Sequence, residues 1–291
     1  MKIAAFDLGG TNYKAAFFEN DRLTAFDQTN SLSDMPPEDT IEYILQKTRE
    51  FNAEAIGISV AGAVENGTIL QSPNFTNFDG FPIKKSVKRA AGIKTIVEND
   101  ANCAAWAAHV IYKKERLLFM TLGTGVGGGI IYDNHLISGG VSAEIGHMTI
   151  LPSGPRCHCG NRGCVESLIG GWAIRRELER MGYHISVKEL FKASEHDRRL
   201  RKFVMRLGEY LGIAIASASN LFSPELIILG GKISLSFDYF SAATIRSFSR
   251  RVFKRLNKTP IINSGIDHAE LVGAKLLAER IPNISKDEKY D

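Results

Sequence analysis

A stretch rich in cysteine and histidine, residues 144–166, has the side chains needed to bind a metal ion. It reads EIGHMTILPSGPRCHCGNRGCVE and holds three of the chain's four cysteines, with a histidine ten residues before the first of them. Zinc prefers nitrogen and thiolate ligands in a tetrahedral arrangement, and tight C-x-C-x4-C spacing among prolines and glycines is hard to explain as core packing. The alternative is a loop of three unliganded thiols. We expect a structural zinc bound by His147, Cys157, Cys159 and Cys164.

The neighbours of these ligands are a second histidine and two carboxylates. His158 lies between two cysteines that must point at one metal, so we expect its side chain to point away and rank it below His147 as a ligand. Glu144 shares a turn with His147, and Glu166 follows the last cysteine by two residues. A bound metal would therefore hold two carboxylates in place.

Two glycine-rich loops have the composition of phosphate-binding loops. The first, DLGGTN, spans residues 7–12, and the second, GTGVGGG, spans residues 123–129. Glycine allows positive φ and close backbone approach, so successive N–H groups can surround a phosphate; Lys14 adds a cation, and Asp7 could hold Mg²⁺ through water. Tight hairpins also use glycine for geometry alone, and the Gly-Gly pair after residue 229, a possible site for an adenine ring, could be a plain strand-to-helix turn. The candidate nucleotide-binding residues are Asp7, Gly9, Gly10, Thr11, Asn12, Lys14, Gly123, Thr124, Gly125, Gly230 and Gly231.

The segment Glu98-Asn99-Asp100-Ala101-Asn102 could supply a catalytic carboxylate. It follows an expected strand and precedes an alanine-rich helix. In α/β sheets, ligands bind beyond the carboxyl ends of the strands, and a hydroxyl that accepts a phosphoryl group needs a carboxylate to take its proton. Asp100 is therefore a candidate general base. The alternative is a helix N-cap, a position that Asn and Asp fill well.

The expected elements form two similar halves. Strands at 2–7, 13–18 and 22–26, a helix at 38–51, a strand at 55–60, a helix at 84–91, a strand at 94–98 and a helix at 101–111 predict an α/β unit with a mixed sheet. Aligning DLGG (7–10) with TLGT (121–124) places residues 14–20 against 128–134, which indicates internal duplication with the zinc segment inserted into the second copy. The second half continues with a helix at 201–221, a strand at 225–231, a helix near 237–256, a strand at 259–263 and a last helix at 269–280.

Composition limits the class of protein. The 291 residues suffice for two domains, and 44% hydrophobic with 23% charged residues is typical of a globular protein. No apolar run is long enough to span a membrane, and the N-terminus lacks the pattern of a signal peptide, so we expect a cytoplasmic protein. The net charge of +4 is mild, and the basic runs at 198–201 and 250–258 have helical spacing without interleaved aromatics. We therefore expect neither nucleic acid nor membrane as a partner.

Together these motifs resemble the ROK family (repressors, open reading frames and kinases) of the actin-like sugar kinase superfamily, across essentially the whole chain. The segment LGTGVGGGIIYDNHLISGGVSAEIGH (122–147) is similar to the family signature, CHCGNRGCVE (157–166) to its zinc motif and DLGGTNYK (7–14) to its first phosphate loop. The resemblance implies duplicated actin-like (ribonuclease H-like) ATPase domains with a central cleft and a zinc-binding insertion. The smaller domain would comprise residues 1–116 together with a C-terminal helix at about 269–281, and the larger one residues 117–268 with the zinc module at 144–166.

The resemblance also implies an activity, closest to that of bacterial ATP-dependent glucokinases: phosphorylation of glucose to glucose 6-phosphate with ATP and Mg²⁺. Kinases of the family for N-acetylmannosamine, N-acetylglucosamine, fructose or allose are alternatives, since residues 72–83 have phenylalanines where glucokinases commonly have tryptophan. His158 stands where family members often have glycine. By the resemblance, Asp100 would act as base toward the 6-hydroxyl, and the residues that bind the hexose would be Gly62, Asn74, Asn99, Asp100, Glu144, His147 and Glu166.

A sugar-sensing regulator without catalytic activity is the rival class. Such relatives resemble this chain with an added N-terminal helix-turn-helix region, and here the first phosphate strand begins at residue 2, leaving no room for one. The intact phosphate loops and Asp100 favour an enzyme. We expect a homodimer or homotetramer whose partners are a hexose and ATP.

Overall fold

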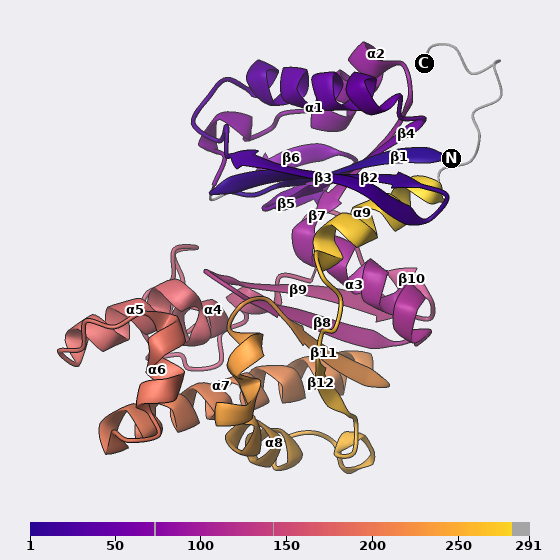
Figure 1. Ribbon diagram of the computed structural model, residues 1–291. Helices are drawn as coiled ribbons and strands as arrows, with labels where there is room; N and C mark the ends of the chain where they lie inside the picture. The colour runs from indigo at the N-terminus through magenta and orange to yellow at the C-terminus, as the bar shows by residue number, and fades with distance from the viewer. Residues whose placement is uncertain (73, 142, 281–291) are drawn as a thin grey trace. The chain divides into compact units, whose positions relative to one another are not determined.

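The computed structural model describes residues 1–72, 74–141 and 143–280 and divides into two compact units (Figure 1). Among the described residues, the first unit comprises those within 1–107, 138–141 and 266–280, and the second comprises residues 108–137 and 143–265. The domain boundaries expected after residues 116 and 268 stay a prediction, and position 281 of the expected last helix lies outside the described residues.

The first unit is built on a mixed five-stranded sheet of order β3-β2-β1-β4-β7. Neighbours pair antiparallel from β3 to β1 and parallel from β1 to β7. This confirms the expected meander followed by alternating helices and strands. The strands are β1 (Lys2–Leu8), β2 (Asn12–Glu19), β3 (Arg22–Asn30), β4 (Ala55–Val60) and β7 (Lys94–Asn99), with a separate hairpin of β5 (Ala63–Glu65) and β6 (Thr68–Gln71).

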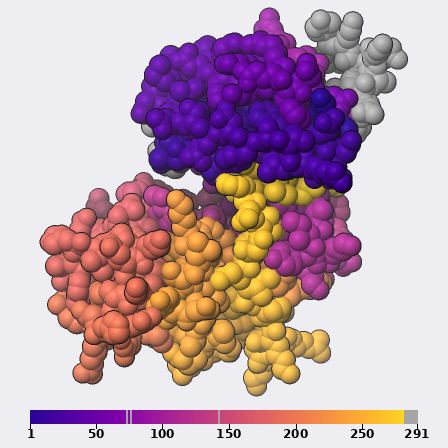
Figure 2. All heavy atoms as spheres, viewed as in Figure 1, coloured from indigo at the N-terminus to yellow at the C-terminus, as the bar shows by residue number. Residues whose placement is uncertain are grey.

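Helices cover both faces of this sheet (Figure 1). Because successive side chains of a strand point to opposite faces, Phe6 packs in the core beneath α1, whereas Ala5 packs with Cys103 of α3 and Leu271 of α9. Figure 2 shows the yellow atoms of α9 against the indigo atoms of the N-terminal strands, so both ends of the described chain build one unit. The helices are α1 (Pro37–Phe51), η1 (Thr76–Phe78), α2 (Ile83–Ala91), α3 (Asp100–Tyr112) and α9 (Ala269–Glu279).

The second unit repeats this sheet. Its order is β10-β9-β8-β11-β12, again antiparallel on one side of the third strand and parallel on the other. The same order and directions in both sheets agree with an internal duplication. The strands are β8 (Leu117–Leu122), β9 (Val126–Tyr132), β10 (His135–Leu136), β11 (Leu226–Gly230) and β12 (Ile261–Asn263).

The glycine loops of the two copies differ in length by one residue, and this difference corrects the expected alignment. Leu8 pairs with Tyr13 across the first hairpin, whereas Leu122 pairs with Val126 across the second. The second loop is therefore one residue shorter, and Lys14 corresponds to Gly127 instead of Gly128. The expected residue-for-residue match holds for the strands before the loop and is wrong after it.

The remaining helices of the second unit surround its core. The insertion lies between β10 and α7, where the first unit has only a short connection between β3 and α1. The single helix expected near 237–256 is wrong, because the backbone of Phe240 (φ −127°, ψ 1°) interrupts it and it breaks into three pieces. The helices are η2 (Ile145–His147), α4 (Val165–Ile169), α5 (Gly171–Arg180), α6 (Val187–Ala193), α7 (Arg198–Phe222), η3 (Ser234–Tyr239), α8 (Ser241–Ser249) and η4 (Lys254–Leu256).

Within the described residues, no helix has both the length and the apolar character needed to cross a membrane.

Packing of α9 depends on glycine at two close approaches. A Cβ added at Gly273 would lie 1.7 Å from the Cys103 carbonyl oxygen, and one at Gly57 would lie 2.2 Å from that of Ala274. We expect Gly273→Ala to lower the free energy of unfolding by about 1–3 kcal/mol, since the helix must shift away from its neighbours. Urea unfolding measures this. Gly265→Ala, where the nearest atom is Tyr112 Oη at 3.8 Å, is the control, and equal stability of the two variants would contradict the close packing.

Candidate active site

The parallel strands of the first sheet end side by side. Leu8 pairs with Val60, and Val60 pairs with Asn99, so β1, β4 and β7 finish at one edge of the sheet. The first glycine loop, the turn containing Gly62 and the start of α3 at Asp100 follow directly from these three strand ends. This edge is where an open α/β sheet binds its ligand.

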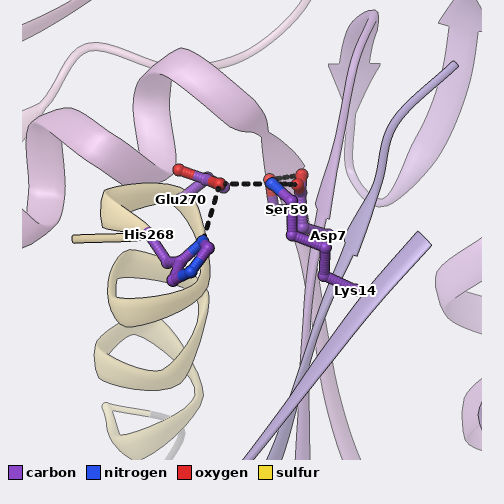
Figure 3. A network of polar contacts seen from close by, with 5 residues as sticks. All are labelled: Asp7, Lys14, Ser59, His268 and Glu270. Carbon is purple, nitrogen blue, oxygen red and sulfur yellow. Dashed lines mark hydrogen bonds and ion pairs between the residues drawn. The ribbon is translucent and has the colours of Figure 1, made fainter. Parts of the chain in front are cut away.

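Asp7 and Lys14 form an ion pair beside the first glycine loop. They lie opposite each other in the β1–β2 register, and Lys14 Nζ donates to Asp7 Oδ2 at 2.8 Å. Ser59, on the other neighbour of β1, donates to Asp7 Oδ1 at 3.2 Å. From the first turn of α9, Glu270 Oε1 accepts a second hydrogen bond from Lys14 Nζ at 2.9 Å and lies 3.9 Å from His268 Nδ1 (Figure 3).

Burial and charge shift the pKa values of this pair. Burial raises the pKa of Asp7, and the neighbouring Glu270 carboxylate raises it further, against the opposing effect of Lys14. Burial alone would lower the pKa of Lys14, but the attraction of both carboxylates outweighs it and the pKa is raised. Lys14 is therefore a permanent cation held next to a glycine loop, as a phosphate-binding lysine must be.

The glycine loop itself is tightly turned. Gly9 donates its N–H to the Asn12 carbonyl at 3.1 Å, and Ser31 donates to the Thr11 carbonyl at 3.0 Å, so the loop is fixed at both ends. Gly10 and Thr11 are exposed. Their N–H and hydroxyl groups can face a ligand, and the expected phosphate site at this loop stays a prediction.

Asn99, not Asp100, caps helix α3. Its Oδ1 accepts from the N–H groups of Ala101 at 2.9 Å and Asn102 at 3.1 Å, while its Nδ2 donates to the Gly62 carbonyl at 3.0 Å. Asp100 is the first residue of the helix and stays partly exposed. The N-cap position is thus filled by Asn99, and Asp100 Oδ1 also accepts the Ala101 N–H at 2.8 Å, so the Asp100 carboxylate contacts the same helix end.

Asn74 and Gly62 lie at the same edge. A Cβ added at Gly10 would lie 2.6 Å from the Asn74 side chain, so this exposed asparagine lies beside the first glycine loop. Its N–H donates to Ser72 Oγ at 3.2 Å, and Ser72 in turn donates to the Ala61 carbonyl at 2.5 Å. The first unit therefore brings together all of its predicted site residues, from the glycine loop to Asp100.

The second glycine loop is braced by the start of α5. Gly171 donates its N–H to the Gly123 carbonyl at 2.9 Å, and Trp172 donates to the Thr124 carbonyl at 3.1 Å. Glu166 Oε2 accepts from the Val126 N–H at 3.0 Å, and a Cβ at Gly125 would lie 2.4 Å from that oxygen. Glycine at 125 is therefore required for the approach of a carboxylate, a reason that differs from the one expected from sequence.

Gly230 and Gly231 end β11 next to this loop. A Cβ at Gly231, which has φ +81°, would lie 2.5 Å from the Leu122 carbonyl oxygen, and one at Gly230 would lie 2.6 Å from the ring of Phe119. The Gly-Gly pair thus adjoins the end of β8, where the second glycine loop begins. The expected nucleotide role of the pair stays a prediction.

The four predicted zinc ligands lie together. One ligand atom from each of His147, Cys157, Cys159 and Cys164 falls within 4.8 Å of every other. Cys159 Sγ and Cys164 Sγ are 3.7 Å apart, and Cys157 Sγ is 3.7 Å from His147 Nδ1. Zinc–sulfur bonds of about 2.3 Å place the sulfur atoms of a tetrahedral site roughly 3.8 Å apart. The donor set therefore fits a zinc ion in both chemistry and spacing.

The two nitrogens of His147 face different partners. Nδ1 faces the cysteines, and Nε2 lies 4.0 Å from Glu144 Oε2. Burial raises the pKa of the Glu144 carboxyl. His158, the lower-ranked ligand, stacks on Trp172 with ring centroids 4.0 Å apart and lies outside the clustered donor atoms. The predicted order of the two histidines agrees with this geometry.

Three contacting residues were missed from sequence. Ser59 and Glu270 hold the Asp7–Lys14 pair, and Glu270 is 256 residues from Lys14 along the chain, so no local pattern could link them. Trp172 donates its indole N–H to Glu166 Oε1 at 3.2 Å. Its signal was weak: it is one of two tryptophans and lies six residues after a predicted site carboxylate.

Comparison with known proteins identifies relatives over nearly the whole chain. The profile of the ROK family matches residues 3–281. The chain is 32% identical to a glucokinase from Thermotoga maritima, over 80% of this chain and 83% of the relative, and 32% identical to an N-acetylmannosamine kinase from Vibrio cholerae, over 82% and 86%. The crystal structure of a ROK hexokinase from Thermus thermophilus superposes with a TM-score of 0.85 at 30% identity, covering 96% of this chain and 98% of that one.

Removing one zinc ligand tests the metal site. We expect about one zinc per wild-type chain and a loss of most of it in Cys164→Ser, because a hydroxyl does not replace a buried thiolate ligand. Elemental analysis of freshly purified protein measures this. Cys103→Ala, at a buried cysteine of α3 outside the cluster, is the control and should keep its zinc. Wild-type protein that is fully folded without zinc would contradict the assignment.

Proposed function

The chain belongs to the ROK family and is a sugar kinase of that family, and we propose that it transfers the γ-phosphate of ATP to the 6-hydroxyl of glucose. The observation that carries the proposal is the edge of the first sheet. There the first glycine loop, with Lys14 paired to Asp7, lies beside the start of α3. Phosphate binding and proton acceptance are the two tasks of such a transfer, and this edge supplies a group for each.

Asp100 is the proposed general base. A sugar hydroxyl attacks phosphorus effectively only when its proton can leave. As the hydroxyl oxygen forms its bond to the γ-phosphorus and the bond to the leaving ADP oxygen breaks, the proton passes to the Asp100 carboxylate. Asp100 Oδ1 already accepts the Ala101 N–H at 2.8 Å, and because a carboxylate has about four lone-pair positions, it can accept the sugar proton as well.

The glycine loops and Lys14 are the proposed nucleotide site. The loop N–H groups and Thr11 would bind phosphate oxygens, and Lys14 would neutralise charge on them. Mg²⁺, when bound with ATP, would supply further positive charge at the transferred group, and Asp7 is the proposed residue for holding it. In the second unit, Gly123, Thr124, Gly125, Gly230 and Gly231 are the proposed nucleotide contacts.

Hexose-binding residues are proposed in each unit. Gly62, Asn74 and Asn99 are proposed from the first unit, and Glu144, His147 and Glu166 from the second. Glu166 already accepts two hydrogen bonds from protein N–H groups, but a carboxylate has about four lone-pair positions and can accept sugar hydroxyls as well. Zinc bound through Nδ1 of His147 would fix the orientation of the imidazole ring, and Nε2 would then point in one direction and could bind a sugar hydroxyl.

N-acetylmannosamine is the second candidate substrate, favoured by the equal identity of the chain to a kinase for that sugar. The phenylalanines of the segment 72–83 do not decide between the sugars. Phe75 and Phe78 are 0% and 1% exposed, belong to the core of the first unit and contact each other edge to face. Both rings are buried in the core and are not available to a sugar, so we infer that the polar residues select the sugar. A cytoplasmic homodimer or homotetramer completes the proposal.

Asparagine at position 100 separates catalysis from capping. We expect Asp100→Asn to lower turnover by about 10²–10⁴-fold, because the amide cannot accept the proton, while the melting temperature changes little because the cap resides on Asn99. A coupled assay of ADP release and thermal unfolding measure the two effects. Asp238→Asn, at an exposed aspartate of the second unit, is the control. Wild-type turnover in Asp100→Asn would exclude it as the base.

A panel of hexoses tests the substrate. With ATP and Mg²⁺, we expect kcat/KM to be highest for glucose and lower for N-acetylmannosamine, N-acetylglucosamine, fructose and allose, and the product from glucose to be the 6-phosphate. Coupled kinetics and phosphorus NMR of the product measure this. A higher kcat/KM for N-acetylmannosamine would replace glucose by the second candidate and leave the proposed chemistry unchanged.

A further inference from the structure

Trp172 lies at the junction of three segments of the second unit. Its ring stacks on His158 with an interplanar angle of 18°. Its indole N–H donates to Glu166 Oε1, and its backbone N–H donates to the Thr124 carbonyl. Trp172 therefore contacts the zinc loop, the proposed sugar-binding residue Glu166 and the second glycine loop.

The contact with the zinc loop is direct. His158 lies between two zinc ligands, Cys157 and Cys159, so its backbone position is fixed when both thiolates bind one ion. The His158 side chain is exposed apart from this stack. The Arg176 guanidinium also lies over the Trp172 ring, 4.9 Å from its centroid, and donates to the Ser167 carbonyl at 3.0 Å. Contacts with His158 and Arg176 thus set the plane of the indole.

The plane of the indole sets the direction of its N–H. That N–H and the Val126 N–H each bind one oxygen of Glu166, so the carboxylate is fixed between the Trp172 side chain and the second hairpin. A hydrogen bond to a charged acceptor is sensitive to angle and distance. Movement of the indole would therefore move Glu166 and loosen the loop that contains Thr124.

We propose that Trp172 is a positioning residue that transmits zinc occupancy, through its stack on His158, to Glu166 and to the second glycine loop. Zinc then does more than fold its own loop: it orients a carboxylate that the proposed function assigns to the sugar. The kinetic part rests on that proposed function, whereas the coupling between zinc loop and indole does not.

Fluorescence tests the coupling independently of activity. Trp106 and Trp172 are the only tryptophans, so Trp106→Phe leaves Trp172 as the sole reporter. In this background we expect removal of zinc by a chelator to raise the emission and shift it to longer wavelength, because the indole loses its stack and becomes hydrated. Adding His158→Ala should keep about one zinc per chain yet abolish most of that change, and His196→Ala, an exposed histidine of the same unit, should leave it intact.

Kinetics test the consequence for the sugar site. Trp172→Phe keeps an aromatic ring for the stack but removes the indole donor, and we expect KM for the hexose to rise about tenfold with kcat and zinc content little changed, since one hydrogen bond to a charged group is lost. His158→Ala should raise the same KM severalfold. If no hexose is phosphorylated at all, the proposed function fails and the fluorescence result still stands.

Two outcomes would overturn the proposal. One is Trp172 emission that does not respond to zinc, or that responds equally with His158→Ala. The other is an unchanged KM for the hexose in a Trp172→Phe protein that phosphorylates it. If Trp172→Phe does not fold, the pair of His158→Ala and His196→Ala decides the question alone.

Discussion

The parallel register of three strands is the constraint on which the first half of the site depends. Because Leu8, Val60 and Asn99 are paired in a row, the glycine loop and the start of α3 meet at one edge. Side chains alternate along a strand, so a slip of one residue would turn each one to the opposite face. Asp7 would then enter the core beneath α1, and its contacts with Lys14, Ser59 and Glu270 would be lost.

The two copies of the hairpin are supported in different ways. In the first unit, α9 supplies Glu270 to hold Lys14 opposite Asp7. In the second, the position that corresponds to Lys14 is a glycine, and the support comes from the insertion, whose Glu166 and Trp172 bind the hairpin backbone. The two hairpins therefore differ at corresponding positions: the first has the charged side chain of Lys14, and the second has Gly127, which has no side chain.

Sequence predicts the parts of this protein that are determined locally. The zinc ligands are recognisable because few other arrangements explain three cysteines and a histidine among glycines. The strands of both sheets and helices such as α1 and α7 follow from their apolar spacing, whereas the helix expected near 237–256 breaks into three pieces. The resemblance of the motifs to one family agrees with the comparisons. The choice between Asn99 and Asp100 as cap could not be read from sequence, because both residue types cap well. The ion pair to Glu270 depends on where α9 packs, and the one-residue difference between the hairpins depends on strand pairing.

The charges around the first loop favour a metal–nucleotide complex over a free nucleotide. Asp7 and Glu270 contribute two negative charges and Lys14 one positive charge, which leaves the cluster with a net negative charge beside the proposed phosphate site. A polyphosphate approaching this cluster would be repelled by the carboxylates unless it brought cations with it. Magnesium bound to the nucleotide would reverse the sign of the interaction with Asp7, whose pKa is raised first by burial and then by the Glu270 carboxylate. In the proposed nucleotide site, the cluster of Asp7, Lys14 and Glu270 would therefore discriminate by charge between ATP and its magnesium complex.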